Sequence, residues 1–175
     1  PVQYVMISFD GAHDIEQWKR SRALAQATGA HFTYFLSCVF LLSKETRSQY
    51  KPPNAAAGRS NVGFALSRDE IIDRLEQINL AVGDGHELAS HGCGHFDGGK
   101  WTEAQWKHEF GQFDAILRGA YALNGLTNQP ANWSKVVDDV RGFRAPYLST
   151  DAALYTALGE SGFAYDASGV SHGPV

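Results

Sequence analysis

The sequence predicts a single α/β domain over residues 1–175, with parallel strands inside and helices outside. Segments rich in β-branched and aromatic residues alternate with segments of helical period, an order that is typical of a parallel sheet. Polar side chains follow the predicted strands, at the end where such folds build their sites: Asp10, His91, His95 and Arg144. Apolar residues make up 43% of the chain, which is enough to bury one sizeable core.

Local signals predict the elements of the first half of the chain. A buried first strand is expected at residues 3–9. Asp14 is a typical helix N-cap and Gly29 a typical residue after a helix end, so a helix is predicted between them. A second strand is expected at residues 31–37. The stretch 44–63 has neither helical nor strand period, and we expect a long surface loop that forms part of a cleft wall.

The second half continues the alternation of helices and strands. Capping residues and helical spacing of apolar side chains mark the helices, and glycines mark their ends. The predicted elements are a helix from Ser67 to residue 82, a strand at 86–90, a helix from Thr102 to about 123, a short helix and a strand near 142–143 after an ambiguous stretch from 136, a helix at 151–160 and a strand at 162–166.

Composition excludes several classes of function. Lys and Arg number 15 against 19 Asp and Glu, which gives a formal net charge of −4. This balance argues against a nucleic-acid binder and against a protein that binds anionic membranes, because both need a basic face. The longest strictly apolar run, residues 38–42, is too short to span a bilayer. No signal peptide is visible at the start of the chain, which begins at Pro1.

Two histidines with the spacing H-x3-H follow the predicted strand at 86–90. Alone this spacing is a weak signal, but Gly92 and Gly94 let the backbone turn sharply, so that His91 and His95 can face one point. Asp10 lies at the end of another predicted strand. Two imidazoles and one carboxylate are a common ligand set for an open catalytic Zn²⁺ site.

Three segments occur in a fixed order along the chain. They are Ser8-Phe9-Asp10-Gly11-Ala12, then G-H-E-L-A-S at residues 85–90 leading into His91-Gly92-Cys93-Gly94-His95, and then Arg144-Ala145-Pro146-Tyr147. In order and sequence they resemble the motifs T-F-D-D-G, H-S/T-x-x-H and R-x-P-F/Y of the polysaccharide deacetylases of the NodB-homology type, which form carbohydrate esterase family 4. The resemblance covers nearly the whole chain.

The resemblance implies a distorted (β/α) barrel, usually of seven strands, and metal-dependent removal of acetyl groups. The substrates would be acetylated polysaccharides, most often N-acetylated glycans such as peptidoglycan or chitin. It implies that His91 and His95 bind the metal, which we expect to be zinc. By the same resemblance, Arg144 orients the catalytic base, the backbone N–H of Tyr147 helps to hold the oxyanion, and Pro146 stiffens that turn against the substrate.

The first motif departs from the family pattern, because Gly11 replaces the second of two adjacent aspartates. Asp10 then takes the position of the base and the metal carboxylate is missing, or Asp10 binds the metal and another residue is the base. Asp14 and His13 are candidates for that base, although capping already explains Asp14. We therefore place Asp10 in both roles.

The family's late L-x-x-H motif, which supplies a general acid, is absent. His172 fits it poorly and is interpreted as a tail residue. We expect the chain to be a fragment that lacks the last strand or strands of the barrel.

Two further features have alternative interpretations. Cys38 and Cys93 each follow a predicted strand, so they either form a disulfide in an oxidising compartment or are two unpaired buried residues. Trp101 is the best candidate for stacking on a sugar, whereas the helical period around Trp106 favours core packing.

Three functions follow from these observations. The first is an extracytoplasmic (periplasmic or secreted) polysaccharide deacetylase. The second is a carbohydrate-binding pseudoenzyme, which Gly11 favours and the intact histidine pair opposes. The third is an amidohydrolase of the same fold that acts on a small amide, which a Cys38–Cys93 disulfide would oppose.

Overall fold

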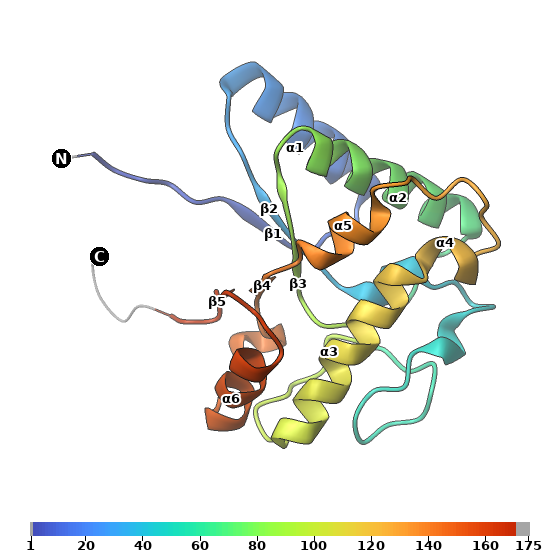
Figure 1. The fold of residues 1–175 in the computed structure, drawn as a ribbon, viewed down its shortest axis with the longest axis vertical. Coiled ribbons are helices and arrows are strands. Elements are labelled where there is room, and N and C mark those ends of the chain that lie inside the picture. The colour runs from blue at the N-terminus through green and yellow to red at the C-terminus, as the bar shows by residue number, and fades with distance from the viewer. Residues whose placement is uncertain (1, 171–175) are drawn as a thin grey trace.

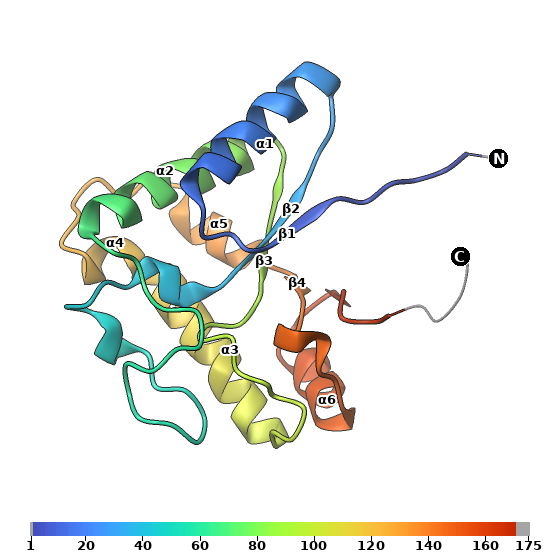
Figure 2. The ribbon, with the colours of Figure 1, turned by 180° about the vertical axis from the view of Figure 1, so that it is seen from behind.

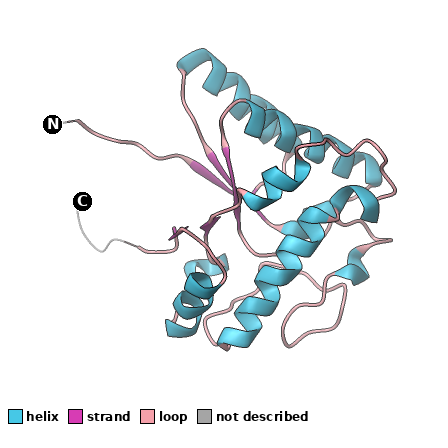
Figure 3. Cartoon of the chain, viewed as in Figure 1, coloured by secondary structure: helices cyan, strands magenta, loops and turns pink. Residues whose placement is uncertain are grey.

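The computed structural model describes residues 2–170, which fold into a central sheet with helices around it (Figure 1). The strands are β1 (Ser8–Gly11), β2 (Thr33–Leu36), β3 (Glu87–Ser90), β4 (Gly142–Phe143) and β5 (Tyr165–Asp166). The α-helices are α1 (Ile15–Thr28), α2 (Arg68–Gly83), α3 (Glu103–Arg118), α4 (Ala120–Leu123), α5 (Trp133–Asp138) and α6 (Ala152–Glu160). Short 3₁₀ helices are η1 (Cys38–Leu41), η2 (Arg47–Gln49) and η3 (Pro146–Leu148), and Figure 3 shows helices and strands in separate colours.

Every strand lies beside the next one in the sequence, in the order β1-β2-β3-β4-β5, and all pairings are parallel. Doubly wound sheets reverse their strand order at a switch point, whereas this sheet does not, so its arrangement is that of a (β/α) barrel. Figure 2 shows the helices on the outside of the sheet, while the side on which residues 2–7 extend is not covered by helices. The predicted fold class is confirmed.

The sheet is strongly curved, as one side chain shows: it reaches from the end of β4 to β1. Arg144 donates hydrogen bonds to Ser8 and Asp10. Strands lie about 4.8 Å apart, so β1 and β4 would be separated by about 14 Å in a flat sheet. The guanidinium also lies on the ring of Phe35 in β2, 4.4 Å from its centroid, and therefore fills the concave side of the sheet.

Two apolar clusters hold the helices to the sheet. The larger one packs β2, α1, α2 and α3 together, and in it Trp18 stacks on Tyr34 with ring centroids 3.9 Å apart. The smaller one joins β4, α3 and α6 around Trp106, Phe110 and Phe143. As predicted, Trp106 is a core residue.

The expectation of a buried strand at residues 3–9 is wrong for its first part. β1 begins at Ser8, and the preceding residues are exposed, with Met6 97% accessible. Only the carbonyl of Ile7 reaches β2, where it accepts the N–H of Thr33. These apolar residues have the composition of a strand, but no helix or strand within residues 2–170 covers them.

The other boundaries differ from the predicted ones by a few residues. The helix from Thr102 is interrupted at Gly119, which separates α3 from α4. Residues 136–138 of the ambiguous stretch belong to α5, which begins earlier, at Trp133. The last strand begins at Tyr165 rather than at residue 162. No helix within residues 2–170 is long and apolar enough to cross a bilayer.

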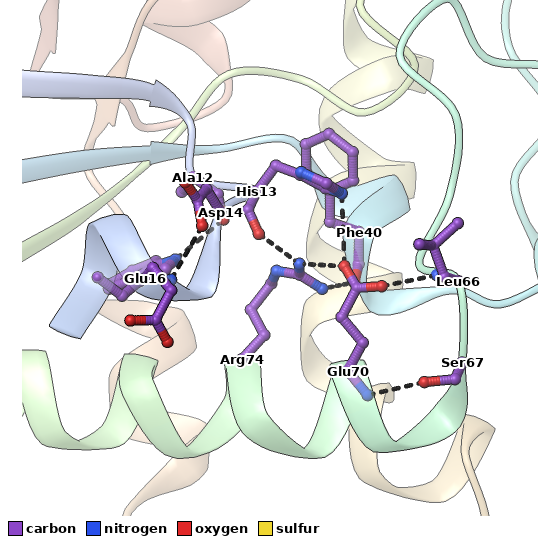
Figure 4. A network of polar contacts seen from close by, with 10 residues as sticks. Ala12, His13, Asp14, Glu16, Phe40, Leu66, Ser67, Glu70 and Arg74 are labelled. Atoms are coloured by element: carbon purple, nitrogen blue, oxygen red, sulfur yellow. Dashed lines mark hydrogen bonds and ion pairs between the residues drawn. The ribbon is translucent and has the colours of Figure 1, made fainter.

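A buried arginine of α2 ties together the loops that follow β1 and β2 (Figure 4). Arg74 is fully buried and donates to the carbonyls of His13 and Phe40 and to the carboxylate of Glu70. Glu70 in turn accepts the backbone N–H of Leu66, just before α2. One guanidinium thus supplies hydrogen bonds to two loop carbonyls that are buried away from water.

Arg74→Ala is expected to lower the free energy of unfolding by about 3–5 kcal/mol, because it leaves Glu70 without its buried partner. Urea unfolding measures this loss. Lys135→Ala is the control: Lys135 is paired with Asp139 but 75% exposed, and its removal should cost less than about 1 kcal/mol. Equal losses in the two variants would contradict the role given to Arg74.

Candidate active site

The loops after β1, β3 and β4 lie at the edge of the sheet formed by the C-terminal ends of the strands. Ala12, His95, Tyr147 and Leu148 in these loops have φ angles of 54°, 54°, 59° and 54°, in the region that favours glycine. Residues other than glycine keep this backbone conformation only where the surrounding structure holds them. Such residues are concentrated at functional sites. This edge is therefore the candidate site.

Asp10 and Arg144 are in direct contact, as their predicted roles require. Arg144 Nη1 donates to Asp10 Oδ1 at 2.7 Å and to Ser8 Oγ at 2.8 Å. Arg144 Nε donates to the carbonyl of Ala167 at 3.0 Å, so the guanidinium is fixed on both sides. The Asp10 side chain is 46% exposed. The result is an oriented carboxylate that remains open to solvent and can accept a proton.

His91 is buried and its ring orientation is fixed. Its Nδ1 lies 2.8 Å from the carbonyl oxygen of Arg144. A carbonyl only accepts, so Nδ1 carries the hydrogen and Nε2 presents a lone pair. Burial lowers the pKa of His91, which favours the neutral ring. A neutral imidazole held in this way is typical of a metal-binding histidine.

His95 lies beside His91, with ring centroids 5.0 Å apart in an edge-on arrangement. The ring of Tyr147 lies 4.8 Å from that of His95 and is exposed. The two histidines of the H-x3-H motif and the tyrosine of the third motif are thus brought together, although they come from different strand ends.

The donor set fits a divalent ion such as Zn²⁺ at two positions, the imidazoles of His91 and His95. Gly11 offers no side chain at the place of a second carboxylate. Within residues 2–170, no three His, Cys, Asp or Glu side chains are close enough together to hold an ion, so Asp10 does not complete a three-ligand group with the histidines. In this structure Asp10 is paired with Arg144 instead.

The turn that carries the histidines is anchored from two directions. Cys38 and Cys93 form a disulfide, which decides between the two interpretations of these residues. Asn61, from the predicted long loop, donates its backbone N–H to the carbonyl of Gly94 at 2.8 Å and its side-chain amide to the carbonyl of His95 at 3.1 Å. The long loop therefore lies against the histidine turn.

Two residues expected to contact substrate are buried. Trp101 is only 7% exposed and packs edge-on against Trp106, so its ring has no free face for a sugar and the stacking expectation is wrong. Pro146 is buried at the start of η3, where it can stiffen the turn but presents no surface to substrate.

The two alternative candidates for the base have other partners. Asp14 caps α1 by accepting the N–H of Glu16 at 2.9 Å. The ring of His13 packs against that of Phe40, and its Nε2 lies 3.4 Å from Glu70 (Figure 4). Each side chain thus has a structural partner of its own. His172 lies outside the described residues.

Three residues that support the site were not predicted from the sequence: Ser8, Tyr50 and Glu109. Ser8 holds Arg144, while Tyr50 and Glu109 lie under the histidine turn. A signal for Glu109 was present, because it lies three residues after Trp106 on a predicted apolar helix face, where a charged residue is out of place.

Comparison with known proteins identifies the fold. No protein-family model and no curated protein matches the chain. Among solved structures, the carbohydrate esterase family 4 domain of a multidomain xylanase, from the hindgut metagenome of Trinervitermes trinervoides, matches 87% of the chain at 17% identity and a TM-score of 0.52. The chitin deacetylase of Colletotrichum lindemuthianum matches 92% at 16% identity and a TM-score of 0.53.

A pseudoenzyme of the same family from Bacillus anthracis is also similar, with 92% of the chain matched at 12% identity and a TM-score of 0.55. The chain spans about half the length of these structures, namely 52%, 53% and 41% of them. The fold is therefore that of part of a NodB-type deacetylase barrel, as the resemblance in the motifs implied.

Reduction of the Cys38–Cys93 disulfide, which closes a loop with a sequence separation of 55, is expected to lower the free energy of unfolding. The entropy of the opened loop predicts a loss of about 4 kcal/mol. Urea unfolding with and without a reductant measures it. The double variant Cys38→Ser/Cys93→Ser is the control and should not respond to reductant. Equal midpoints of the wild type in both conditions would refute the stabilising role.

Proposed function

We propose that this chain is the catalytic part of a metal-dependent polysaccharide deacetylase of carbohydrate esterase family 4. Its substrate would be an N-acetylated amino-sugar glycan such as peptidoglycan or chitin. The disulfide between Cys38 and Cys93 supports an extracytoplasmic location, because disulfides persist in oxidising compartments.

The observation that carries the proposal is the contact between Asp10 and Arg144 beside the histidine pair. The carboxylate and the guanidinium are 134 residues apart in sequence, and their atoms lie 2.7 Å apart in space. Arg144 also presents its carbonyl to His91. One residue thus orients both a proton acceptor and an imidazole ligand, which is the arrangement that a deacetylase needs.

His91 and His95 would hold the ion, which we propose is Zn²⁺. When bound, Zn²⁺ would polarise the acetyl carbonyl and make water nucleophilic at neutral pH. Asp10 would act as the general base that takes a proton from the attacking water, and Arg144 keeps its carboxylate directed toward the site. Asp10 is proposed as the base rather than as a ligand, because its Oδ1 is already committed to Arg144.

Tyr147 supplies the backbone N–H that binds the oxyanion formed when water attacks the carbonyl. Its φ of 59° turns the chain sharply at the end of β4, and the buried Pro146 before it limits the freedom of this turn. A hydrogen-bond donor that is already in place stabilises the oxyanion without any cost of reorganisation in the transition state.

A pseudoenzyme that binds carbohydrate is the second candidate. Gly11 and the lack of a three-ligand group among the described residues favour it. A small-amide amidohydrolase is a weaker candidate, because the disulfide opposes a reducing compartment.

Bound zinc, measured by elemental analysis after Zn²⁺ loading, tests the assignment of His91 and Asp10. We expect about one ion per chain in the wild type, none in His91→Ala, and an undiminished amount in Asp10→Asn. Loss of zinc from Asp10→Asn would make Asp10 a ligand instead. No zinc in the wild type would favour the pseudoenzyme.

Acetate release from chitin oligomers, peptidoglycan and acetylxylan tests the reaction itself. Asp10→Asn should reduce the rate by about 10²–10⁴-fold while leaving bound zinc in place, because only proton transfer is lost. Ser43→Ala, a change in a hydroxyl that pairs with Glu45, serves as the control and should retain the wild-type rate. Binding of these glycans without acetate release would support the pseudoenzyme.

Gly11→Asp is expected to tighten zinc binding by about tenfold, or about 1.4 kcal/mol, because it adds a carboxylate to the two imidazoles. The nearest atom to a Cβ at this position is a ring carbon of Phe40 at 3.6 Å, so space is available. The φ of +80° strains any side chain by about 1–2 kcal/mol, although aspartate tolerates it better than most.

Gly11→Asn is the matched control, since it has the same backbone strain and nearly the same shape without the charge. Zinc dissociation constants obtained by competition with a chromophoric chelator compare the three proteins. Equal constants for the aspartate and asparagine variants would show that no ligand position exists at residue 11.

A further inference from the structure

Glu109 is a buried carboxylate that the proposed reaction does not use. It is 2% exposed and lies on the face of α3 that carries Trp106, Phe110 and Phe113. Burial of a carboxylate in such a place is costly unless specific donors meet it. Its oxygens accept the hydroxyl of Tyr50 at 2.9 and 3.0 Å and the backbone N–H of Cys93 at 2.8 Å.

Cys93 is the central residue of the turn between the two histidines, and the turn is shaped around Glu109 and Tyr50. A Cβ on Gly92 would lie 3.2 Å from Glu109 Oε1. A Cβ on Gly94 would lie 2.6 Å from the rings of both Tyr50 and Phe96, which is too close for any side chain unless they shift. Glu109 and Tyr50 therefore leave little room for a side chain at either glycine of the motif.

Two carbonyls of the turn are bound by other segments. The carbonyl of Gly92 accepts the N–H of Cys38 at 3.0 Å, and the carbonyl of Gly94 accepts the N–H of Asn61 at 2.8 Å. Glu109 accepts the N–H of Cys93, which lies between them. Contacts with three segments thus restrict the backbone that leads to His95, whose φ is 54°.

We propose that Glu109 is a positioning residue, whose buried carboxylate fixes the turn at Cys93 and thereby sets the directions of the His91 and His95 imidazoles. The inference rests on the proposed function, in which these imidazoles hold the metal. Stability alone does not call for a carboxylate here, because a wholly apolar core is often as stable as one that holds a buried charge and its partners.

Zinc affinity and unfolding free energy are measured together, because a purely structural role changes only the second. Glu109→Leu keeps the volume and removes the acceptor of the Tyr50 hydroxyl and the Cys93 N–H. Its free energy of unfolding should fall because these groups stay buried without a partner, and the zinc affinity of the folded variant should fall by at least about tenfold, as for other outer-shell partners. A purely structural role predicts that the folded variant binds zinc as tightly as the wild type.

Glu109→Gln is the rescue variant. Its amide oxygen can accept the N–H of Cys93 and its amide nitrogen can donate to the hydroxyl of Tyr50, so zinc affinity should stay within about threefold of the wild type. If Glu109→Leu does not fold, Tyr50→Phe replaces it and should also weaken zinc binding. The matched control is Tyr121→Phe, which removes a phenol hydroxyl bound to Asn79 and should leave zinc affinity unchanged.

Hydrogen exchange of the Cys93 amide in the metal-free protein separates this inference from the proposed function. We expect exchange to be at least about tenfold faster in Glu109→Leu or Tyr50→Phe than in Tyr121→Phe, because the acceptor or its support is lost. If the wild type binds no zinc, the proposed function fails, and imidazole nitrogen shifts of His91 and His95 replace affinity as the readout. Unchanged exchange, or zinc affinities that match those of Tyr121→Phe, would overturn the inference.

Discussion

One guanidinium links β1, the end of β4 and the segment after β5 across the concave side of the described sheet. Arg144 leaves the end of β4, crosses the concave side over β2 and reaches Asp10 in β1. Two buried charged side chains, one on α2 and one on α3, bind the loops that follow the strands. Arg74 meets carbonyls of the loops after β1 and β2, and Glu109 meets an N–H of the loop after β3. With these groups satisfied, the loops can hold conformations that would otherwise be too costly.

Local signals were enough to predict most of the fold. The N-caps Asp14, Ser67 and Thr102 begin their helices where expected, because capping depends on residues within one turn. The strand predicted at residues 3–9 began too early. The apolar composition of its first residues could not show that they are exposed. The break at Gly119 was also missed, because a glycine within a helical period is compatible with an uninterrupted helix.

The site was predictable only where residues share a motif. His91, His95 and Arg144 belong to such motifs, and the structure brings their loops together. Contacts between distant segments leave little local trace, so the disulfide stayed undecided. The charge of Glu109 on an apolar helix face was a signal of burial with a partner, but it could not show that the partner is the turn between the histidines. The prediction that Trp101 stacks on a sugar was wrong for a related reason. Its position beside the histidine loop could not show that its ring packs on another tryptophan.

The sequence distances between contacting groups impose an order of completion during synthesis. Cys38 and Cys93 are separated by 55 positions, whereas Asp10 and Arg144 are separated by 134. A ribosome adds about 5–20 residues per second, so roughly 10 s pass between the emergence of Asp10 and that of its arginine. For about the last third of that interval the nascent chain contains both histidines and both cysteines. The carboxylate at the centre of the site is therefore made well before the arginine that orients it, and both cysteines of the disulfide are present before that contact can form.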